Sequence, residues 1–188
     1  MVMNLKRRSL RQPDLKIPYA LKRILLQSGR ARLPHGTALL IPGMEVNQAW
    51  LLRDGIVKHY HYNRKGEQEV YHFYLPGDLI VMEEEFLEQK RSKSYLGAIG
   101  QVILIPISYQ QFLQGSQQFP QLLLIPLMQL MLAAKKRLVT RNKLLQCPAP
   151  ERYQRFIKLF PAHLLLVKDI AAYLHLFPTT LSKIKSRY

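Results

Sequence analysis

Hydroxyl and ammonium side chains gather near the C-terminal end of the chain, between Pro178 and Lys185. Groups of both kinds form hydrogen bonds with phosphate oxygens and with the edges of purine bases. The side chains able to do so are Thr179, Thr180, Ser182, Lys183 and Lys185. Their types and spacing predict a surface that contacts nucleic acid.

The apolar residues around this stretch predict two short helices joined by a tight turn at residues 175–177. These residues are Ile170, Ala171, Leu174, Leu176, Leu181 and Ile184. The polar residues of the second helix then lie on the face away from Leu181 and Ile184. Ala171 is small where the second helix must cross closely, which is typical of a helix-turn-helix. An arbitrary helical hairpin with a basic outer face is the alternative interpretation.

The distribution of charge supports a polyanionic partner. The 188 residues include 28 Lys and Arg against 12 Asp and Glu, a net charge of +16. Residues 1–35 carry nine basic and one acidic residue, residues 36–116 carry seven and nine, and residues 117–188 carry twelve and two. Such asymmetry is expected when one part of a chain touches nucleic acid. We expect double-stranded DNA as the partner, ahead of an acidic membrane surface. The basic stretch before residue 35 has no assigned role, with an organelle-targeting helix as one alternative.

The single cysteine, Cys147, excludes a disulfide or a multi-cysteine metal site within one chain. The longest apolar run, from Leu122 to Ala134, is much shorter than the roughly 20 residues of a membrane span. We therefore expect a cytoplasmic protein with no membrane segment.

The middle of the chain predicts a β domain. Short apolar or alternating runs between Gly36 and Ile107 are separated by turn signals, among them Asp54-Gly55 and Pro76-Gly77-Asp78. The expected strands are TALLI, AWLLRDG, IVKHYHYN, EVYHFYL and QVILIPI. Their spacing of about ten residues favours an antiparallel sandwich or barrel of the jelly-roll type, followed by helices, so the fold class is α+β.

Beyond Ser108 the periodicity becomes helical, with a short helix expected over residues 109–115 and a long one over 121–146. Along the long helix, apolar residues recur at heptad a and d spacing, interrupted by Arg141: Leu124, Leu127, Met131, Ala134, Leu138 and Leu145. This stripe predicts pairing with the same helix of a second chain; packing on the chain's own β domain is the alternative. Pro126 is expected to start or kink the helix. Residues 147–150 are interpreted as a linker, and helices are expected at 151–160, 167–174 and 178–186.

The order of these parts resembles the Crp/Fnr family of transcription regulators over about residues 20–187. The segments that carry the likeness are Glu151-Arg152-Tyr153, Ile170 to Leu174, Pro178 to Lys185, Gly55, Lys65-Gly66 and Pro76-Gly77-Asp78. The resemblance implies a cyclic-nucleotide-binding-like β-roll with an N-terminal helix at 1–116, a dimerisation helix at 117–147 and a helix-turn-helix domain at 148–188. It also implies base contacts by Thr179, Ser182 and Lys183.

The helix-turn-helix departs from the family pattern at several positions. His175 stands where the turn usually has glycine, and Phe177 replaces the usual Ser or Thr before the proline. Lysines replace arginines that recognise guanine through two bonds, which leaves point-charge contacts. The chain stops at Tyr188, so we expect it to lack the β-hairpin wing. We expect DNA binding with weak sequence discrimination.

The slots for the family's nucleotide-binding residues hold other side chains. Where relatives have Gly-Glu the chain has Val81-Met82, and where they have Arg-Ser/Thr-Ala it has Ser92-Lys93-Ser94. Glu83 and Arg91 each lie one residue out of register. The residues of the expected effector pocket are Met82, Glu83, Arg91 and Ser92. We expect no cofactor and an unknown small-molecule effector, with a cyclic nucleotide as the less favoured alternative.

Two other function classes remain open. His59, His61 and Glu67 nearly match the metal-binding pattern of cupin enzymes, and imidazoles with a carboxylate suit iron, manganese or zinc. Their spacing is wrong, however, and no histidine lies between His72 and His163, so we expect no enzyme. A sensor or scaffold of the same fold without DNA binding is the second alternative. The favoured interpretation is a homodimeric transcription regulator that binds DNA and contacts RNA polymerase.

Overall fold

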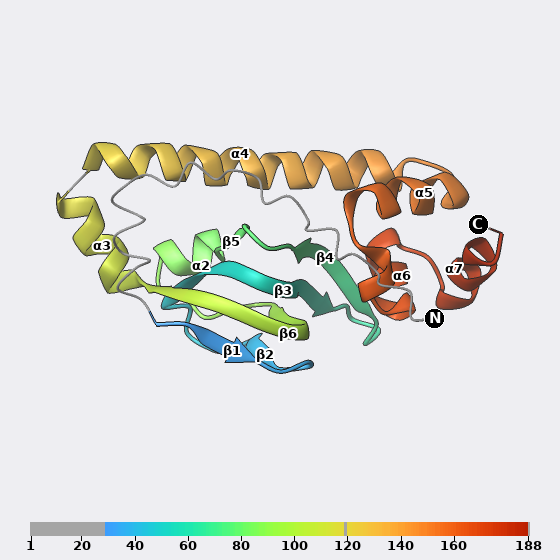
Figure 1. Ribbon diagram of the computed structural model, residues 1–188, viewed down its shortest axis with the longest axis horizontal. Helices are drawn as coiled ribbons and strands as arrows, with labels where there is room; N and C mark the ends of the chain where they lie inside the picture. The colour runs from blue at the N-terminus through green and yellow to red at the C-terminus, as the bar shows by residue number, and fades with distance from the viewer. Residues whose placement is uncertain (1–28, 119, 188) are drawn as a thin grey trace, which may run out of the picture.

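The structure, a computed structural model, describes residues 29–118 and 120–187. It places a β domain at the centre, the long helix α4 along its entire length, and the last helices together at one end (Figure 1). The strands are β1 (Ala31–Leu33), β2 (Ala38–Leu40), β3 (Gln48–Tyr62), β4 (Gln68–Tyr74), β5 (Leu79–Ile80) and β6 (Tyr95–Ser108). The helices are α2 (Glu83–Leu87), α3 (Tyr109–Gln118), α4 (Pro120–Leu145), α5 (Ala149–Leu159), the 3-10 turn η1 (Ala162–Leu164), α6 (Val167–Leu174) and α7 (Pro178–Lys185).

Every pairing in the sheet is antiparallel. The strand order is β1-β6-β3-β4, with β2 also paired to β6 and β5 to β3. The two long strands β3 and β6 form the spine, with Gln48 opposite Ser108 at one end and Tyr60 opposite Tyr95 at the other. This is the antiparallel jelly-roll sheet of the predicted α+β class, which is confirmed.

The predicted strand break at Asp54-Gly55 is wrong, because β3 runs through both residues. The register to β6 shifts on either side of Asp54, so the chain absorbs the turn signal as a bulge. Gly55 has φ of +83°, and a Cβ atom at this position would lie 2.3 Å from the carbonyl oxygen of Gln101. A glycine is therefore required here for a bulge inside a continuous strand.

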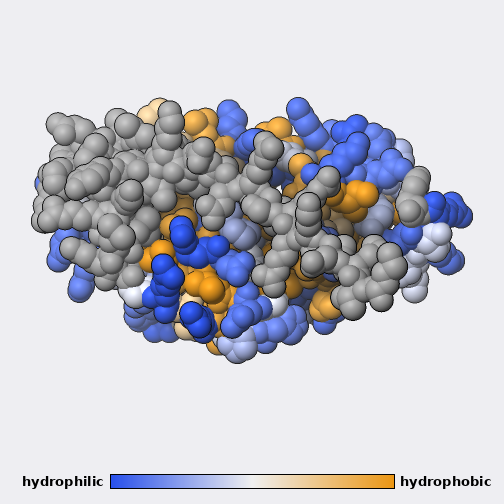
Figure 2. All heavy atoms as spheres, in the orientation of Figure 1, coloured by the Kyte–Doolittle hydropathy of each residue, from blue (hydrophilic) through white to orange (hydrophobic). Residues whose placement is uncertain are grey.

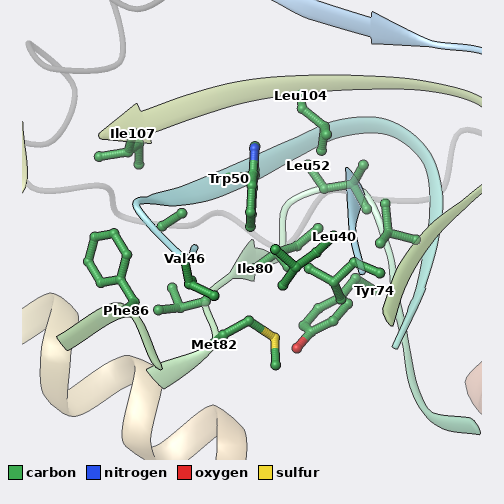
Figure 3. Packing of buried hydrophobic residues seen from close by; sticks show 14 of the residues in the cluster. Leu40, Val46, Trp50, Leu52, Tyr74, Ile80, Met82, Phe86, Leu104 and Ile107 are labelled. Atoms are coloured by element: carbon green, nitrogen blue, oxygen red, sulfur yellow. The ribbon is translucent and has the colours of Figure 1, made fainter. Parts of the chain in front are cut away.

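The interior of the β domain is a filled apolar core. Trp50, Leu52, Leu104 and Ile107 of the two long strands pack with residues of the shorter elements. Figure 3 shows Met82 and Tyr74 pointing toward one another inside this core. Both are buried, at 6% and 3% exposure.

The helices agree closely with the expected ones, with two corrections. Helix α5 begins at Ala149, so only the first half of the predicted linker at 147–150 lies outside a helix. Pro126 was expected to start or kink the long helix, but it lies inside α4, which begins at Pro120, so the prediction that it starts the helix is wrong. Pro120 stands in the first turn of α4, where a proline is tolerated because the amide hydrogens have no acceptor within the helix.

A second core joins the β domain to the C-terminal helices. Val70 and Phe73 of the sheet are fully buried against Phe156 of α5 and Tyr173 of α6. Among these aromatic residues, the Phe73 ring centre lies 6.1 Å from that of Phe156 and 5.5 Å from that of Tyr173. The helix pair α6 and α7 thus belongs to a C-terminal unit that packs directly onto the β domain (Figure 1).

The N-terminal helix expected before residue 29 lies outside the described residues. Within the part of the chain that is described, no helix combines the length and the hydropathy needed to span a membrane.

Candidate nucleic-acid interface and effector site

The helix pair α6 and α7 is held by the apolar residues that the periodicity predicts. Ile170, Leu174 and Leu181 are fully buried, and Ala171 and Ile184 are nearly so. The small side chain of Ala171 allows the two helices to cross closely, since a larger group would separate their backbones. This packing fixes the orientation of α7.

The turn between the helices places His175 in a conformation that favours glycine. His175 ends α6 in the left-handed conformation, with φ of 52° and ψ of 49°. The amide hydrogens of His175 and Leu176 both bond to the carbonyl of Ala171, which is a typical way to close a helix. At the start of α7, Phe177 offers no side-chain cap and is 75% exposed.

The five polar residues predicted to contact DNA all lie exposed on α7. Thr179, Ser182 and Lys183 face away from the buried Leu181 and Ile184, and Thr180 and Lys185 lie at the edges of this exposed face. Among the described residues neither Lys183 nor Lys185 has an ion-pair partner, so both ammonium groups are available to an external anion. The Ser182 hydroxyl donates to the carbonyl of Pro178 at 2.9 Å and retains its acceptor capacity. Figure 2 shows hydrophilic residues gathered at this end of the molecule on the face in view.

Two arginines connect the α6–α7 helix pair to α4. The Arg141 guanidinium donates to the carbonyl of Val70 in β4 at 3.3 Å and lies 2.9 Å from Nε2 of His175. Arg152 of α5 donates to the carbonyl of Cys147, just after α4, and to that of Leu174 at the end of α6. The turn of the helix-turn-helix is therefore tied both to the sheet and to the end of α4.

A buried ion pair attaches α6 to the β domain. Nζ of Lys58 in β3 lies 2.6 Å from Oδ1 of Asp169, with side-chain exposures of 14% and 1%. The Gln68 amide donates to the same carboxylate oxygen at 2.8 Å. Because Asp169 lies in the first turn of α6, its charge also interacts favourably with the positive end of the helix dipole.

Each of the four residues of the predicted effector pocket has contacts within the protein. Met82 is part of the filled core, and the Glu83 carboxylate lies 3.6 Å from the guanidinium of Arg137 in α4. Arg91 points to the surface, where it bonds to the carbonyl of Gly43 and lies 3.6 Å from the Glu45 carboxylate. Ser92 is buried and donates to the carbonyl of Ser94. The charged groups of the predicted effector pocket, Glu83 and Arg91, thus have contacts with other residues of the protein.

Two half-buried histidines lie on neighbouring strands of the sheet. His59 and His72 are directly opposite each other in β3 and β4. Nε2 of His59 lies 2.8 Å from the Ser94 hydroxyl. Burial, assisted by the positive charge of Arg137, lowers the pKa of His59 to about 4 and that of His72 to about 3. Both imidazoles are therefore neutral at pH 7.

The residues of the metal-site alternative each have a different partner. His59 contacts Ser94, the His61 ring lies 3.8 Å from the Glu69 carboxylate, and Glu67 accepts a hydrogen bond from the Asn63 side chain. Within the described ranges no group of three His, Cys, Asp or Glu side chains has a geometry that could hold a metal ion.

The contacts between domains were not predicted from the sequence. Lys58 and Asp169 are 111 residues apart, and no local pattern links them. Arg141 is unusual in the sequence because it interrupts an apolar stripe, but the sequence does not predict its contacts with Val70 and His175.

Comparison with known proteins agrees with this geometry. Residues 30–119 match the family model of the cyclic nucleotide-binding domain. No curated protein matches the chain significantly in sequence.

Several solved structures share the fold over most of the chain. The c-di-GMP responsive global regulator CLP of Xanthomonas campestris has a TM-score of 0.72 and 18% identity, covering 89% of each chain. FixK2 from Bradyrhizobium japonicum has a TM-score of 0.74 and 16% identity, covering 85% of this chain and 83% of its own. A CRP-family transcriptional regulator from Thermus thermophilus, TTHB099, has a TM-score of 0.68 and 16% identity, covering 84% of this chain and 83% of its own. Residues 30–119 are therefore similar to the cyclic nucleotide-binding domain, and the chain shares its overall fold with these solved transcription regulators.

Proposed function

We propose that the protein is a DNA-binding transcription regulator that acts as a homodimer and inserts α7 into the major groove. The observation that carries this proposal is the exposed face of α7, with three hydroxyl groups and two unpaired ammonium groups over a rigid apolar base. Lysines and hydroxyl groups supply phosphate contacts and single hydrogen bonds to bases, so affinity exceeds sequence discrimination.

The exposed side of α4 supports dimer formation. Its exposed apolar residues are Met128, Met131, Leu132, Leu138 and Val139. They form a stripe along one helix face, and a second copy of α4 is the partner that such a repeat fits best. A two-fold dimer then presents two copies of α7, which match DNA half-sites about 34 Å apart.

The contacts of Arg141 and Arg152 supply a route from the β domain to the DNA. A partner or effector that moves α4 against the sheet also moves the turn at His175, because Arg141 bonds to both. We expect a small-molecule effector other than a cyclic nucleotide, since Glu83 and Arg91 already have partners within the protein. As for other regulators of this fold, RNA polymerase is the expected protein partner on DNA.

Fluorescence anisotropy with DNA fragments tests the role of α7. Lys183→Ala should weaken binding about tenfold, the loss typical of one base or phosphate contact. Lys136→Ala, which removes an exposed lysine of α4, should change binding less than about twofold, an effect of charge alone. Equal losses in the two variants would show only a general electrostatic attraction. No dependence of affinity on salt would rule out phosphate contacts altogether.

A further inference from the structure

The exposed apolar stripe of α4 contains two polar residues along its centre line, Lys135 and Asn142. Together with Met128 they are spaced by seven residues, and all three are exposed. The pairs Met131 with Leu132 and Leu138 with Val139 flank Lys135 on its two sides along the helix. The repeat corresponds to positions a, d and e of a heptad, with Lys135 at an a position.

Other side chains of α4 face the protein itself. Leu130 packs on the core of the β domain, Arg137 lies over the Tyr74 ring and Leu144 is buried. The predicted dimer stripe is wrong at its C-terminal end, because Leu145 packs on the chain's own core. Arg141, which interrupts the stripe, also contacts the chain's own β domain. Ala134 is half-buried. Met131 and Leu138 remain exposed as predicted, and the side chains of Leu124 and Leu127 lie outside the described residues. In Figure 2 hydrophobic and hydrophilic residues alternate along the upper edge, where Figure 1 places α4.

The charge of Lys135 has no counterpart on its own helix. Residues 120–145 contain five basic residues and no acidic one. Among the described residues no carboxylate lies within ion-pair distance of Lys135. By contrast, Arg137 has Glu83 at 3.6 Å.

We propose that Lys135 of one copy faces Lys135 of the other across the dimer seam, where charge repulsion weakens the dimer and the polar residue at this a position sets its register. The proposal rests on the homodimer proposed above. A two-fold axis along a parallel helix pair places each a residue opposite its own copy. Two ammonium groups in an apolar seam repel each other, and a polar residue at one a position disfavours other registers at a cost in stability.

One consequence is a dependence of dimer formation on ions. Added salt screens the repulsion between the two ammonium groups and strengthens the dimer. The same salt weakens phosphate contacts at α7. The two steps of DNA recognition therefore respond to salt in opposite directions.

Analytical ultracentrifugation of the full chain tests the seam. Lys135→Met should tighten the dimer about tenfold, because repulsion is replaced by apolar contact. Lys136→Met is the matched control, since Lys136 is exposed on the next position outside the stripe, and it should change the dimer affinity less than about twofold. Equal effects of the two substitutions would overturn the proposal.

A charge-swap mixture gives a readout that packing alone does not produce. When Lys135→Glu protein is mixed with wild type, heterodimers should exceed the roughly one half expected for random mixing. A Lys136→Glu mixture should stay at that fraction. If the Lys135→Glu mixture forms dimers but only the random fraction of heterodimers, the proposed contact between the two Lys135 side chains is wrong. If every sample is monomeric, the proposed homodimer is wrong as well.

Discussion

Two residues of the turn before α7 are unusual for the backbone conformations that they adopt: His175 at the end of α6 and Phe177 at the start of α7. His175 adopts φ of 52°, a region that costs free energy for a residue with a side chain. Its ring lies 2.9 Å from the Arg141 guanidinium, a contact that glycine lacks. Partial burial and the charge of Arg141 lower the pKa of His175. The strained residue is thus also the one that connects the turn to α4.

Phe177 supplies a direct test of the missing helix cap. Its backbone is extended, with φ of −70° and ψ of 141°, which suits an N-cap serine. Phe177→Ser should raise the free energy of unfolding by about 1 kcal/mol, because the serine hydroxyl oxygen accepts a hydrogen bond from a backbone amide at the start of α7. Urea titration measures the change. Phe177→Ala is the control, and an equal effect of both substitutions would show that removal of the exposed ring matters instead of the cap.

His59 and His72 make stability depend on pH in a defined direction. Their folded pKa values of about 4 and about 3 lie below the ordinary value of 6.5. The unfolded chain therefore binds more protons once the pH falls below about 6.5, and stability is lost as the pH falls toward about 4. The expected loss is roughly 3 kcal/mol for each histidine over this window.

The histidine contribution is separated from that of the carboxylates by substitution. His72→Phe preserves ring packing on Tyr74 and Phe160 and should reduce the slope of unfolding free energy against pH by about 1.4 kcal/mol per unit, the value for one proton. His163→Phe, at an exposed position, should leave the slope unchanged. Identical slopes for wild type and His72→Phe would contradict the assignment.

Among the elements, one buried charge pair adds to the apolar packing that attaches α6 to the sheet. The Asp169 carboxylate is almost completely removed from water, and Lys58 and Gln68 are its two side-chain donors among the described residues. Breaking a buried pair by removing one partner is costly, because an uncompensated charge remains.

Lys58→Met should therefore lower the free energy of unfolding by about 3 kcal/mol in urea titration. The double variant Lys58→Met, Asp169→Asn should recover part of that loss, since the orphaned charge is then absent. Lys65→Met, in the exposed hairpin after β3, is the control and should cost less than about 0.5 kcal/mol. A loss below about 1 kcal/mol for Lys58→Met would show that the pair does not hold the domains together.

Most elements were predictable from local patterns, and the exceptions have physical reasons. The helices α5, α6 and α7 follow from periodicity and prolines. The continuity of β3 through Gly55 did not, because the same glycine signal marks a turn or a bulge and only the partner strand decides between them. On α4 both faces carry apolar residues, so heptad spacing alone did not separate Leu145, which packs inward, from Leu138, which is exposed.

For the whole molecule, the β domain has the fold of a nucleotide-binding domain, but Glu83 and Arg91 form ion pairs with other residues of the protein. Glu83 pairs with α4, Arg91 with Glu45, and Met82 fills the core near Tyr74 (Figure 3). We expect millimolar cyclic AMP to leave the Tm of the protein unchanged in a thermal shift assay, since a ligand raises stability only when it binds the folded state. A clear rise in Tm would contradict this expectation.

The candidate site was predictable on one side only. The exposed face of α7 follows from the spacing of five polar residues between buried Leu181 and Ile184. The effector residues were inferred from resemblance alone, and their contacts with Glu45, Gly43 and Arg137 depend on segments distant in sequence. Tertiary packing, which local spacing does not encode, decides where these side chains point.

Selection of bound fragments from random DNA tests the central claim, a dimer that reads DNA through α7. We expect the recovered fragments to share an inverted repeat, with half-site centres about 34 Å apart, and this enrichment to be lost in Lys183→Ala. Fragments without a common sequence or spacing, recovered equally by wild type and Lys183→Ala, would contradict it.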